Sequence, residues 1–183
     1  MNPDYRIREA RHDDLAALAD IERAAAATFA SVGIVGDFLD EATSIEELSA
    51  ARAEGRLWVA VHDERCVGFA IAFTFEDGEA WLDEIDVHPD HGRRGVGRAL
   101  VASVIAWARR GGSRSLSLTT FRDVAWNAPF YASLGFRELA PERHSDAIRA
   151  ILEDEKRRNL PMDRRLVMRL ELATAPVWAT QPD

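Results

Sequence analysis

The stretch from Ala80 to Arg114 constrains the fold most, because it joins an extended segment, a glycine-rich turn and a helix. It reads AWLDEIDVHPDHGRRGVGRALVASVIAWARRGGSR. Pro89 ends the extended part, since proline lacks a backbone donor and restricts the residue before it. A helix is expected from Ala99 to Arg110, followed by a stop at Gly111 and Gly112. Strand, glycine loop and helix in this order predict a site for a phosphate group.

The loop is basic, although the chain as a whole is acidic. From His91 to Arg122 there are seven arginines and no Asp or Glu, whereas the formal net charge of the chain is -8. The first amides of a helix lack partners and carry the positive end of its dipole, so they can bind an anion. Glycine lets the backbone approach closely, and arginine adds a forked donor. We therefore expect a bound polyanion.

Two segments resemble the signatures of one enzyme family. IDVHPDHGRRGVGRAL resembles motif A of the GCN5-related N-acetyltransferases (the GNAT family), whose loop amides hold the pyrophosphate of acetyl-coenzyme A. WNAPFYASLGF resembles the family's helix with an Asn and a Tyr, followed by the Gly-Phe that starts the next strand. Where the family has Gln or Arg, this chain has Gly92, and Arg93 and Arg94 can compensate. Asn127 precedes Tyr131 by four residues, closer than the family's commoner spacing.

The resemblance spans about residues 5–172 and implies acetyl-coenzyme A as co-substrate, with no metal. It places coenzyme contacts at the end of the strand, in the loop and at the start of the second helix. The residues concerned are Asp86, Val87, Gly92, Arg93, Arg94, Gly95, Val96, Gly97, Arg98 and Asn127. Assembly as a homodimer is a further expectation, which rests only on how members of the family commonly assemble.

The pattern predicts a single mixed α/β domain over residues 1–172, with a mostly antiparallel sheet splayed at one parallel strand pair and flanked by helices. Segment 145–160 forms a helical insertion before the last strand, and 173–183, with Trp178, a tail. Strands are expected at 5–10, 57–62, 67–75, 81–88, 115–120, 136–139 and 165–172, the last with one face towards solvent. Helices are expected from Asp13 or Asp14 to Phe29, from the Ser44–Glu47 capping box to Gly55, from Asn127 to Gly135, and over 145–158. Residues 31–43 are expected to be a loop, and the resemblance implies that this loop helps to wall the acceptor site.

Composition excludes several classes of protein. The single cysteine, Cys66, allows neither an internal disulfide nor a cysteine-cluster metal site. A pI near 5.2 argues against general nucleic-acid binding. No segment reaches the ~18 apolar residues of a membrane span, so we expect a cytoplasmic protein. The acidic charge weakly favours a cationic acceptor.

The strand from Trp81 carries the candidate base. An amine with a pKa of ~10.4 must lose a proton before it can attack a thioester. Simple alternation puts Leu82, Glu84, Asp86 and His88 on one face of this strand. Three carboxylates on a mostly buried strand are costly unless they function, so Glu84 is the first candidate, directly or through a water. His88 is the second candidate base, and the alternative interpretation is that its side chain caps a turn.

The resemblance gives the remaining chemistry. Tyr131 is the matched position for the acid that protonates the leaving thiolate, and core packing is its alternative role. A backbone amide near Val87 would hold the carbonyl oxygen. The expected reaction is direct transfer of an acetyl group to the primary amine of a small molecule. The alternatives are a protein or peptide amine, or a noncatalytic coenzyme A sensor. A dinucleotide-binding fold is disfavoured, because G-x-G-x-x-L lacks the third glycine.

Overall fold

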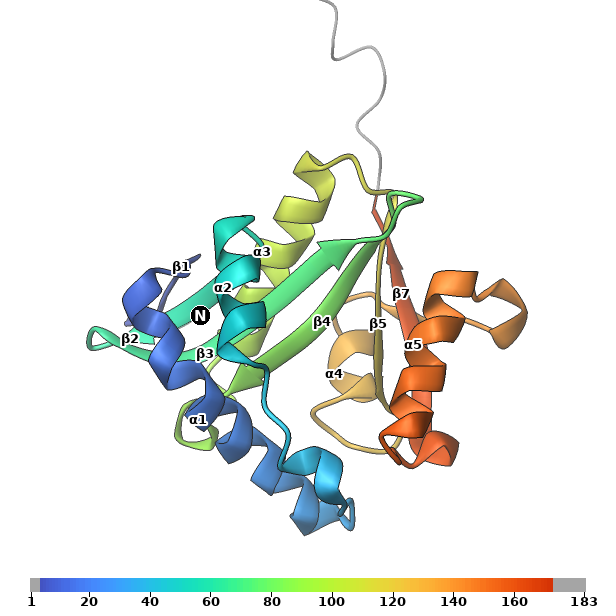
Figure 1. Cartoon of the computed structure of the whole chain (residues 1–183), viewed down its shortest axis with the longest axis horizontal. Helices are drawn as coiled ribbons and strands as arrows, with labels where there is room; N and C mark the ends of the chain where they lie inside the picture. The colour runs from blue at the N-terminus through green and yellow to red at the C-terminus, as the bar shows by residue number, and fades with distance from the viewer. Residues whose placement is uncertain (1–3, 173–183) are drawn as a thin grey trace, which may run out of the picture.

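The computed structural model describes residues 4–172, and these form one mixed sheet flanked by helices (Figure 1). Within them the seven strands lie in the order β1-β2-β3-β4-β5-β7-β6. The strands are β1 Arg6–Glu9, β2 Leu57–His62, β3 Arg65–Thr74, β4 Ala80–Val87, β5 Ser115–Phe121, β6 Arg137–Glu138 and β7 Arg165–Glu171. Neighbouring strands are antiparallel except β4 and β5, which are parallel. The predicted fold class is confirmed; the tail 173–183 lies outside the described residues.

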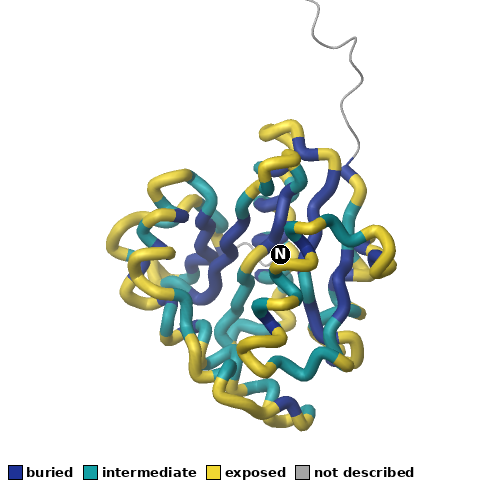
Figure 2. Tube along the Cα trace, turned by 45° about the vertical axis from the view of Figure 1, so that its right-hand side comes forward, coloured by how far each residue is buried: buried dark blue, intermediate teal, exposed yellow. Residues whose placement is uncertain are grey.

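Helices cover both faces of the sheet. They are α1 Leu15–Ala26, α2 Ile45–Ala53, α3 Val96–Arg110, α4 Ala128–Ala132 and α5 Asp146–Arg157. Helices α1 and α2 pack on one face of β2 and β3, and α3 packs on the other. Residues 31–43 are mostly irregular, apart from 3-10 turns at Ala27–Val32 and Asp37–Leu39. The tube coloured by burial shows the strands as the buried layer and the outer surfaces of the helices as exposed (Figure 2).

Helix caps follow the sequence signals in part. Ser44 and Glu47 form the predicted capping box, and α2 begins at the next residue, Ile45. Asp14 occupies the predicted N-cap position of α1, but its side chain does not cap this helix, since its carboxylate accepts hydrogen bonds from Arg8 and from the Arg11 amide. The neighbouring arginine competes for the oxygens that would otherwise reach the first amides of α1.

Strand β4 contains a bulge that simple alternation does not foresee. Ile71 of β3 faces Glu84, and Ala72 faces Leu82, so Asp83 is an extra residue in β4. Leu82 therefore packs on the α3 side of the sheet, whereas Glu84 and Asp86 turn towards α1. The prediction that Leu82 and Glu84 lie on one face is thus wrong. The bulge brings the carboxylates of Glu84 and Asp86 to the α1 side of the sheet.

Strands β4 and β5 are joined over a very short length. Their pairing comprises only Ala80 with Leu116 and Trp81 with Ser117. Beyond these pairs the two strands diverge, as Figure 1 shows at their lower ends. Towards its end β4 thus has a neighbour on the β3 side only, and an opening lies beside Val87.

Helix α5, the predicted insertion, covers the face of β5 and β7 on which Val167 lies. Ile148 of α5 packs with Trp81, Leu139 and Val167 in a buried cluster. Val167 was expected on the solvent side of an alternating strand, but it is buried because α5 lies over it. Among residues 4–172, no helix has both the length and the apolar character needed to cross a membrane.

Ile148→Ala tests whether α5 is part of the core. Ile148 is 0% exposed, so its truncation should lower the free energy of unfolding by about 2–4 kcal/mol. Ile45→Ala is the matched control, because Ile45 is 51% exposed and its truncation should cost less than about 1 kcal/mol. Urea denaturation of the two variants measures both values. Similar losses for the two variants would contradict the packing of α5 described above.

Candidate active site

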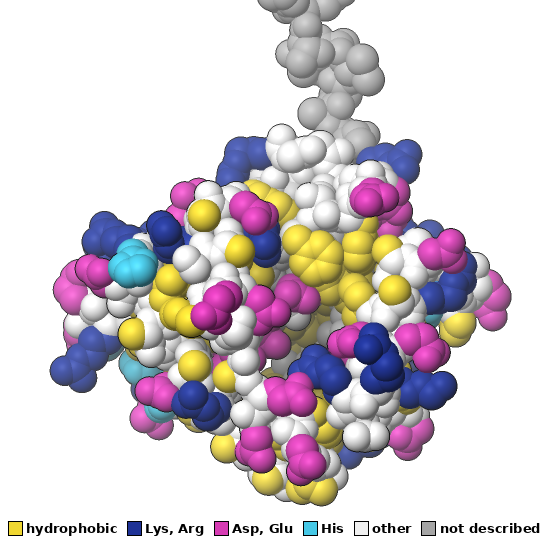
Figure 3. Space-filling model, in the orientation of Figure 1, with side chains coloured by type: hydrophobic (Ala, Val, Ile, Leu, Met, Phe, Trp, Pro, Cys, Tyr) yellow, Lys and Arg dark blue, Asp and Glu magenta, His cyan; other side chains and the backbone are white. Residues whose placement is uncertain are grey.

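A cleft of about 1800 Å³ opens beside the diverging ends of β4 and β5. Its walls come from α1 and the following loop on one side, from α4 and α5 on the other, and from the loop before α3. In the space-filling view, Asp and Glu side chains gather around a hollow in the middle of this face, with Lys and Arg towards the α5 side (Figure 3). We call the side with Glu22, Glu84 and Asp86 the acidic wall. We call the α5 side the basic wall, although its arginines, Arg158 and Arg165, lie beside Asp154 and Glu155.

The loop before α3 offers a row of free backbone donors. Within the described part of the chain, none of the amides from Arg93 to Arg98 donates a hydrogen bond. Arg93 and Gly95 have φ values of 58° and 83°, so the loop curls before the helix begins at Val96. Successive free amides at the positive end of a helix dipole form an anion cradle. The predicted phosphate site is thus present as geometry.

The predicted cradle residues divide into two groups. Gly92, Arg93, Gly95, Val96, Gly97 and Arg98 line the cleft, as do Asp86 and Val87. Arg94 does not line it, because its guanidinium donates to the hydroxyl of Tyr5 (Nη1 to Oη, 3.2 Å). The same hydroxyl lies 3.0 Å from Nδ1 of His91. Arg94 thus holds the loop against β1 from behind, and a coenzyme contact by its side chain stays a prediction.

The end of β4 presents a further donor to the cleft. The His88 amide bonds to the Val67 carbonyl on β3. Because amides alternate along a strand, the Val87 amide points the other way, into the opening next to β5. This is the amide that the resemblance implied for the carbonyl oxygen. His88 itself accepts from the Asp90 amide through Nδ1 (3.3 Å), so the alternative reading of this histidine as a turn cap is the one observed.

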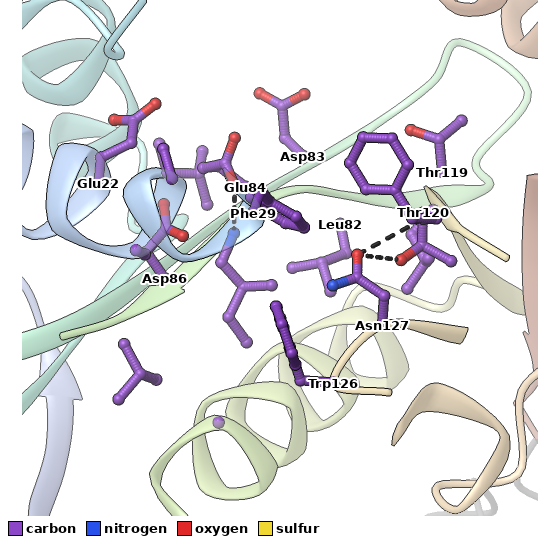
Figure 4. Close-up of a pocket in the computed structure, with 18 of the residues that line it drawn as sticks. Glu22, Phe29, Leu82, Asp83, Glu84, Asp86, Thr119, Thr120, Trp126 and Asn127 are labelled. Carbon is purple, nitrogen blue, oxygen red and sulfur yellow. Dashed lines mark hydrogen bonds between the residues drawn. The ribbon is translucent and has the colours of Figure 1, made fainter. Parts of the chain in front are cut away.

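Three carboxylates meet on the acidic wall (Figure 4). Glu22 of α1, Glu84 and Asp86 each have an oxygen within 4.8 Å of the others'. Burial raises the pKa of Glu84 to about 7, and the charge of Glu22 contributes to the rise, although the Ile85 amide donates to this carboxylate. The pKa of Asp86 is raised well above its usual value by burial and by Glu84. The group thus holds a proton near neutral pH.

Tyr131 lies on the α4 side of the same opening. Its residue is 8% exposed, and its ring packs edge-on against Phe130 and Phe136. Its hydroxyl makes no hydrogen bond among residues 4–172. Burial, with the charges of Glu84 and Asp86, raises the pKa of this phenol, so it stays protonated. The ring of Tyr131 is thus packed in the core, while its hydroxyl remains available as a hydrogen-bond donor.

Asn127 occupies the residue before α4, but its side chain does not cap the helix. Its Oδ1 instead accepts from Thr120 Oγ1 at 2.8 Å and from the Phe121 amide at 3.4 Å (Figure 4). Asn127 thus occupies the predicted N-cap position of α4 without a side-chain cap, because the end of β5 takes the oxygen that would have reached the first amides of this helix. Asn127 lines the cleft, and its coenzyme contact stays a prediction.

Several cleft residues were not predicted. Glu22 follows Leu18 by four residues, so it lies at the edge of the apolar face of α1. Glu155 likewise follows Ile151 by four residues on α5, and it pairs with Arg165 of β7. An acidic residue at a core-facing helical position was the available signal in both cases. Phe38 and Trp126 also line the cleft.

The chain matches the model of the acetyltransferase (GNAT) family over residues 18–136. It is similar to yncA from Salmonella typhimurium, solved with its cofactor acetyl-CoA, at 21% identity over 98% of each chain and a TM-score of 0.66. It is also similar to the ribosomal-protein-S18-alanine N-acetyltransferase from Escherichia coli, at 23% identity over 94% of this chain and 97% of that one, with a TM-score of 0.65. N-acetylglutamate synthase from Neisseria gonorrhoeae, complexed with coenzyme A and N-acetyl-glutamate, has 20% identity over 94% of this chain and 36% of its own, with a TM-score of 0.71.

The fold, the cradle and the opening beside β4 define an acetyl-coenzyme A-dependent acyltransferase. The family match covers more than half of the chain, so the protein belongs to the GNAT family of acetyltransferases. Acetyl-coenzyme A is its co-substrate, and the free amides from Arg93 to Arg98 suit the pyrophosphate of that molecule.

Gly95→Asp tests the cradle. A side chain at φ 83° strains the loop, and a carboxylate there repels the pyrophosphate, so the dissociation constant for acetyl-coenzyme A should rise at least about tenfold. Gly78→Asp is the control, because Gly78 has the same φ of 83° in a turn away from the cleft. Isothermal titration calorimetry measures both. Equal affinities in the two variants would argue against the loop as the binding site.

Proposed function

We propose that the protein transfers an acetyl group from acetyl-coenzyme A to a primary amine by direct attack, without an acyl-enzyme. One observation carries the proposal: a carboxylate with a pKa near 7, Glu84, and a free protonated phenol, Tyr131, lie on either side of one opening at the end of the cradle. A base and an acid at one opening are what amine acetylation requires. A sensor that only binds coenzyme A has no use for this pair.

Glu84 is the proposed base. The acceptor enters as an ammonium ion with a pKa of ~10.4, and the carboxylates of Glu22, Glu84 and Asp86 favour its positive charge. Glu84 then takes a proton, directly or through a water. A carboxylate whose pKa is raised to about 7 is a stronger base than an ordinary glutamate, and it is still deprotonated in part at neutral pH.

Val87 and Tyr131 act on the thioester. The Val87 amide, which has no strand partner on its side, is placed to donate to the carbonyl oxygen as negative charge develops there. Tyr131 donates its proton to the departing sulfur. Because burial and two nearby carboxylates hold the pKa of this phenol high, Tyr131 keeps its proton until a thiolate forms.

A small-molecule amine is the favoured acceptor. The loop over the acceptor side is tied to the far wall, where Glu41 accepts from Arg158 at 2.7 Å. Arg164 also donates to the carbonyls of Val32 and Gly33 at 3.4 Å each. These bonds tie the loop after α1 to the α5 side of the cleft, an arrangement that favours a small acceptor. A peptide or protein amine is the second candidate, favoured by the acidic side chains around the hollow. A cytoplasmic location and a homodimer remain expectations from the sequence.

Glu84→Gln tests the base. An amide cannot accept the proton, so kcat/KM should fall by about 10²–10⁴ while the affinity for acetyl-coenzyme A is kept. In the unaltered protein the rate should rise as the pH passes through about 7, because the deprotonated form of Glu84 is the active one. Thiol-release assays across this range should show that the variant lacks this step. Glu76→Gln, at an exposed residue outside the cleft, is the control and should keep it.

Tyr131→Phe tests the acid. The ring packing against Phe130 and Phe136 is kept and only the hydroxyl is lost, so kcat should fall by about 10²-fold or more. The KM for acetyl-coenzyme A should change little. Steady-state kinetics with a fixed amine separates the two constants. If kcat were unchanged and the thermal stability fell instead, Tyr131 would be a packing residue.

A further inference from the structure

The basic wall of the cleft contains a buried ion pair that the proposed chemistry does not use. Glu155 of α5 and Arg165 of β7 both line the cleft, with side chains that are 8% and 11% exposed. Thr119 of β5 joins them, donating to Glu155 at 2.5 Å and accepting from Arg165 at 2.8 Å. The guanidinium also lies over the ring of Phe121, 4.7 Å from its centre. Side chains from two other elements, α5 and β5, thus fix the position of this arginine.

The geometry of the pair leaves one end of the guanidinium free. Nε and Nη2 of Arg165 donate to the two oxygens of Glu155 at 3.0 and 2.5 Å. Nη1 makes no hydrogen bond within residues 4–172, and it is not among the buried unpaired atoms. An arginine held side-on by one carboxylate can still bind a second anion through its other nitrogens. Arg165 therefore has an open donor where it lines the cleft.

A buried ion pair is a poor means of stabilising a fold. Removing two charges from water costs about as much as their attraction returns, so apolar residues of similar size often stabilise equally well. The charge of Arg165 also reaches the reaction centre, since it opposes the rise in pKa at both Glu84 and Tyr131. The positive charge of Arg165 is held in a fixed position near the proposed base and acid, so it is suited to recognise the acceptor.

The other arginines of the cleft are less suited to this role. Arg56 and Arg158 pair with the exposed carboxylates of Glu54 and Glu41 at 2.6 and 2.7 Å. Arg93 and Arg98 belong to the cradle and its helix, where the phosphates are expected. Arg165 is thus the arginine whose position is fixed and whose free end lies on the acceptor side.

We propose that Arg165 binds a carboxylate that the acceptor carries close to its amine, so that the substrate class is an amino acid or a small amino-acid derivative. The inference rests on the proposed function and makes it more specific. The ammonium group lies at Glu22, Glu84 and Asp86, and the carboxylate at Nη1 of Arg165. The acidic and basic walls then match the two charges of one zwitterion.

The test compares amines that differ in one carboxylate. Each amino acid is paired with the amine left when its carboxyl group is removed, and kcat/KM is measured for both. One charge-assisted hydrogen bond supports a preference of at least about tenfold for the carboxylated member. In the double variant Glu155→Leu with Arg165→Met this ratio should fall to within about threefold of one. The KM for acetyl-coenzyme A should not change.

The double variant avoids leaving a lone buried charge, which could unfold the protein. Its thermal unfolding is measured alongside. The matched control is Asp146→Leu with Arg149→Met, which removes an exposed ion pair of the same helix and should keep the preference. A wild-type ratio near one, or a preference that survives in the Glu155/Arg165 variant, would overturn the inference.

Failure of the proposed function gives a different result. If no amine of either kind releases thiol, the transferase proposal is what fails. Calorimetry then tests the inference without turnover, using the N-acetylated forms of one pair in the presence of coenzyme A. Binding of the carboxylated form that is at least about tenfold tighter, and lost in the Glu155/Arg165 variant, supports the inference. Equal binding of the two forms refutes it.

Discussion

The site depends on the early separation of β4 from β5. Two residue pairs join these parallel strands, and beyond them β4 has no partner on that side. Buried backbone donors without partners are costly, so an opening in the middle of a sheet persists only where something else takes those hydrogen bonds. Here the free amides belong to Val87, Arg93 and residues 95–98, which all line one cleft, where the thioester and the phosphates of acetyl-coenzyme A can accept from them.

The bulge at Asp83 governs the electrostatics of the opening. One extra residue turns Glu84 and Asp86 towards α1, where Glu22 already lies. Three carboxylates so close together cannot all ionise at low cost, and this crowding adds to burial in raising the pKa of Glu84. The same crowding attracts an ammonium ion. In the proposed reaction, binding of the amine and its deprotonation therefore share one physical cause.

The part of the domain after β5 forms the α5 side of the cleft, where we propose that the acceptor is recognised. Helix α5 covers β5 and β7, and it carries Glu155 to the position where it can hold Arg165. The end of α5 and the start of β7 also reach across the cleft, since Arg158 and Arg164 bond to the loop after α1. Helix α5 thus shapes the pocket that we expect to determine the selectivity for the acceptor.

The sequence by itself determined the features that depend on residues close together in the chain. The glycines and arginines of the 92–98 loop, the Ser44–Glu47 capping box and the positions of the strands along the chain were all readable, because each signal lies within a few residues. The tertiary structure alone decided what depends on distant segments. The bulge opposite Ile71, the meeting of Glu22 with Glu84, the loss of the Asn127 cap to Thr120 and the Glu155–Arg165 pair each require partners from separate elements or an irregular strand register. Periodicity describes one element at a time, so it cannot show which side chains two elements bring together.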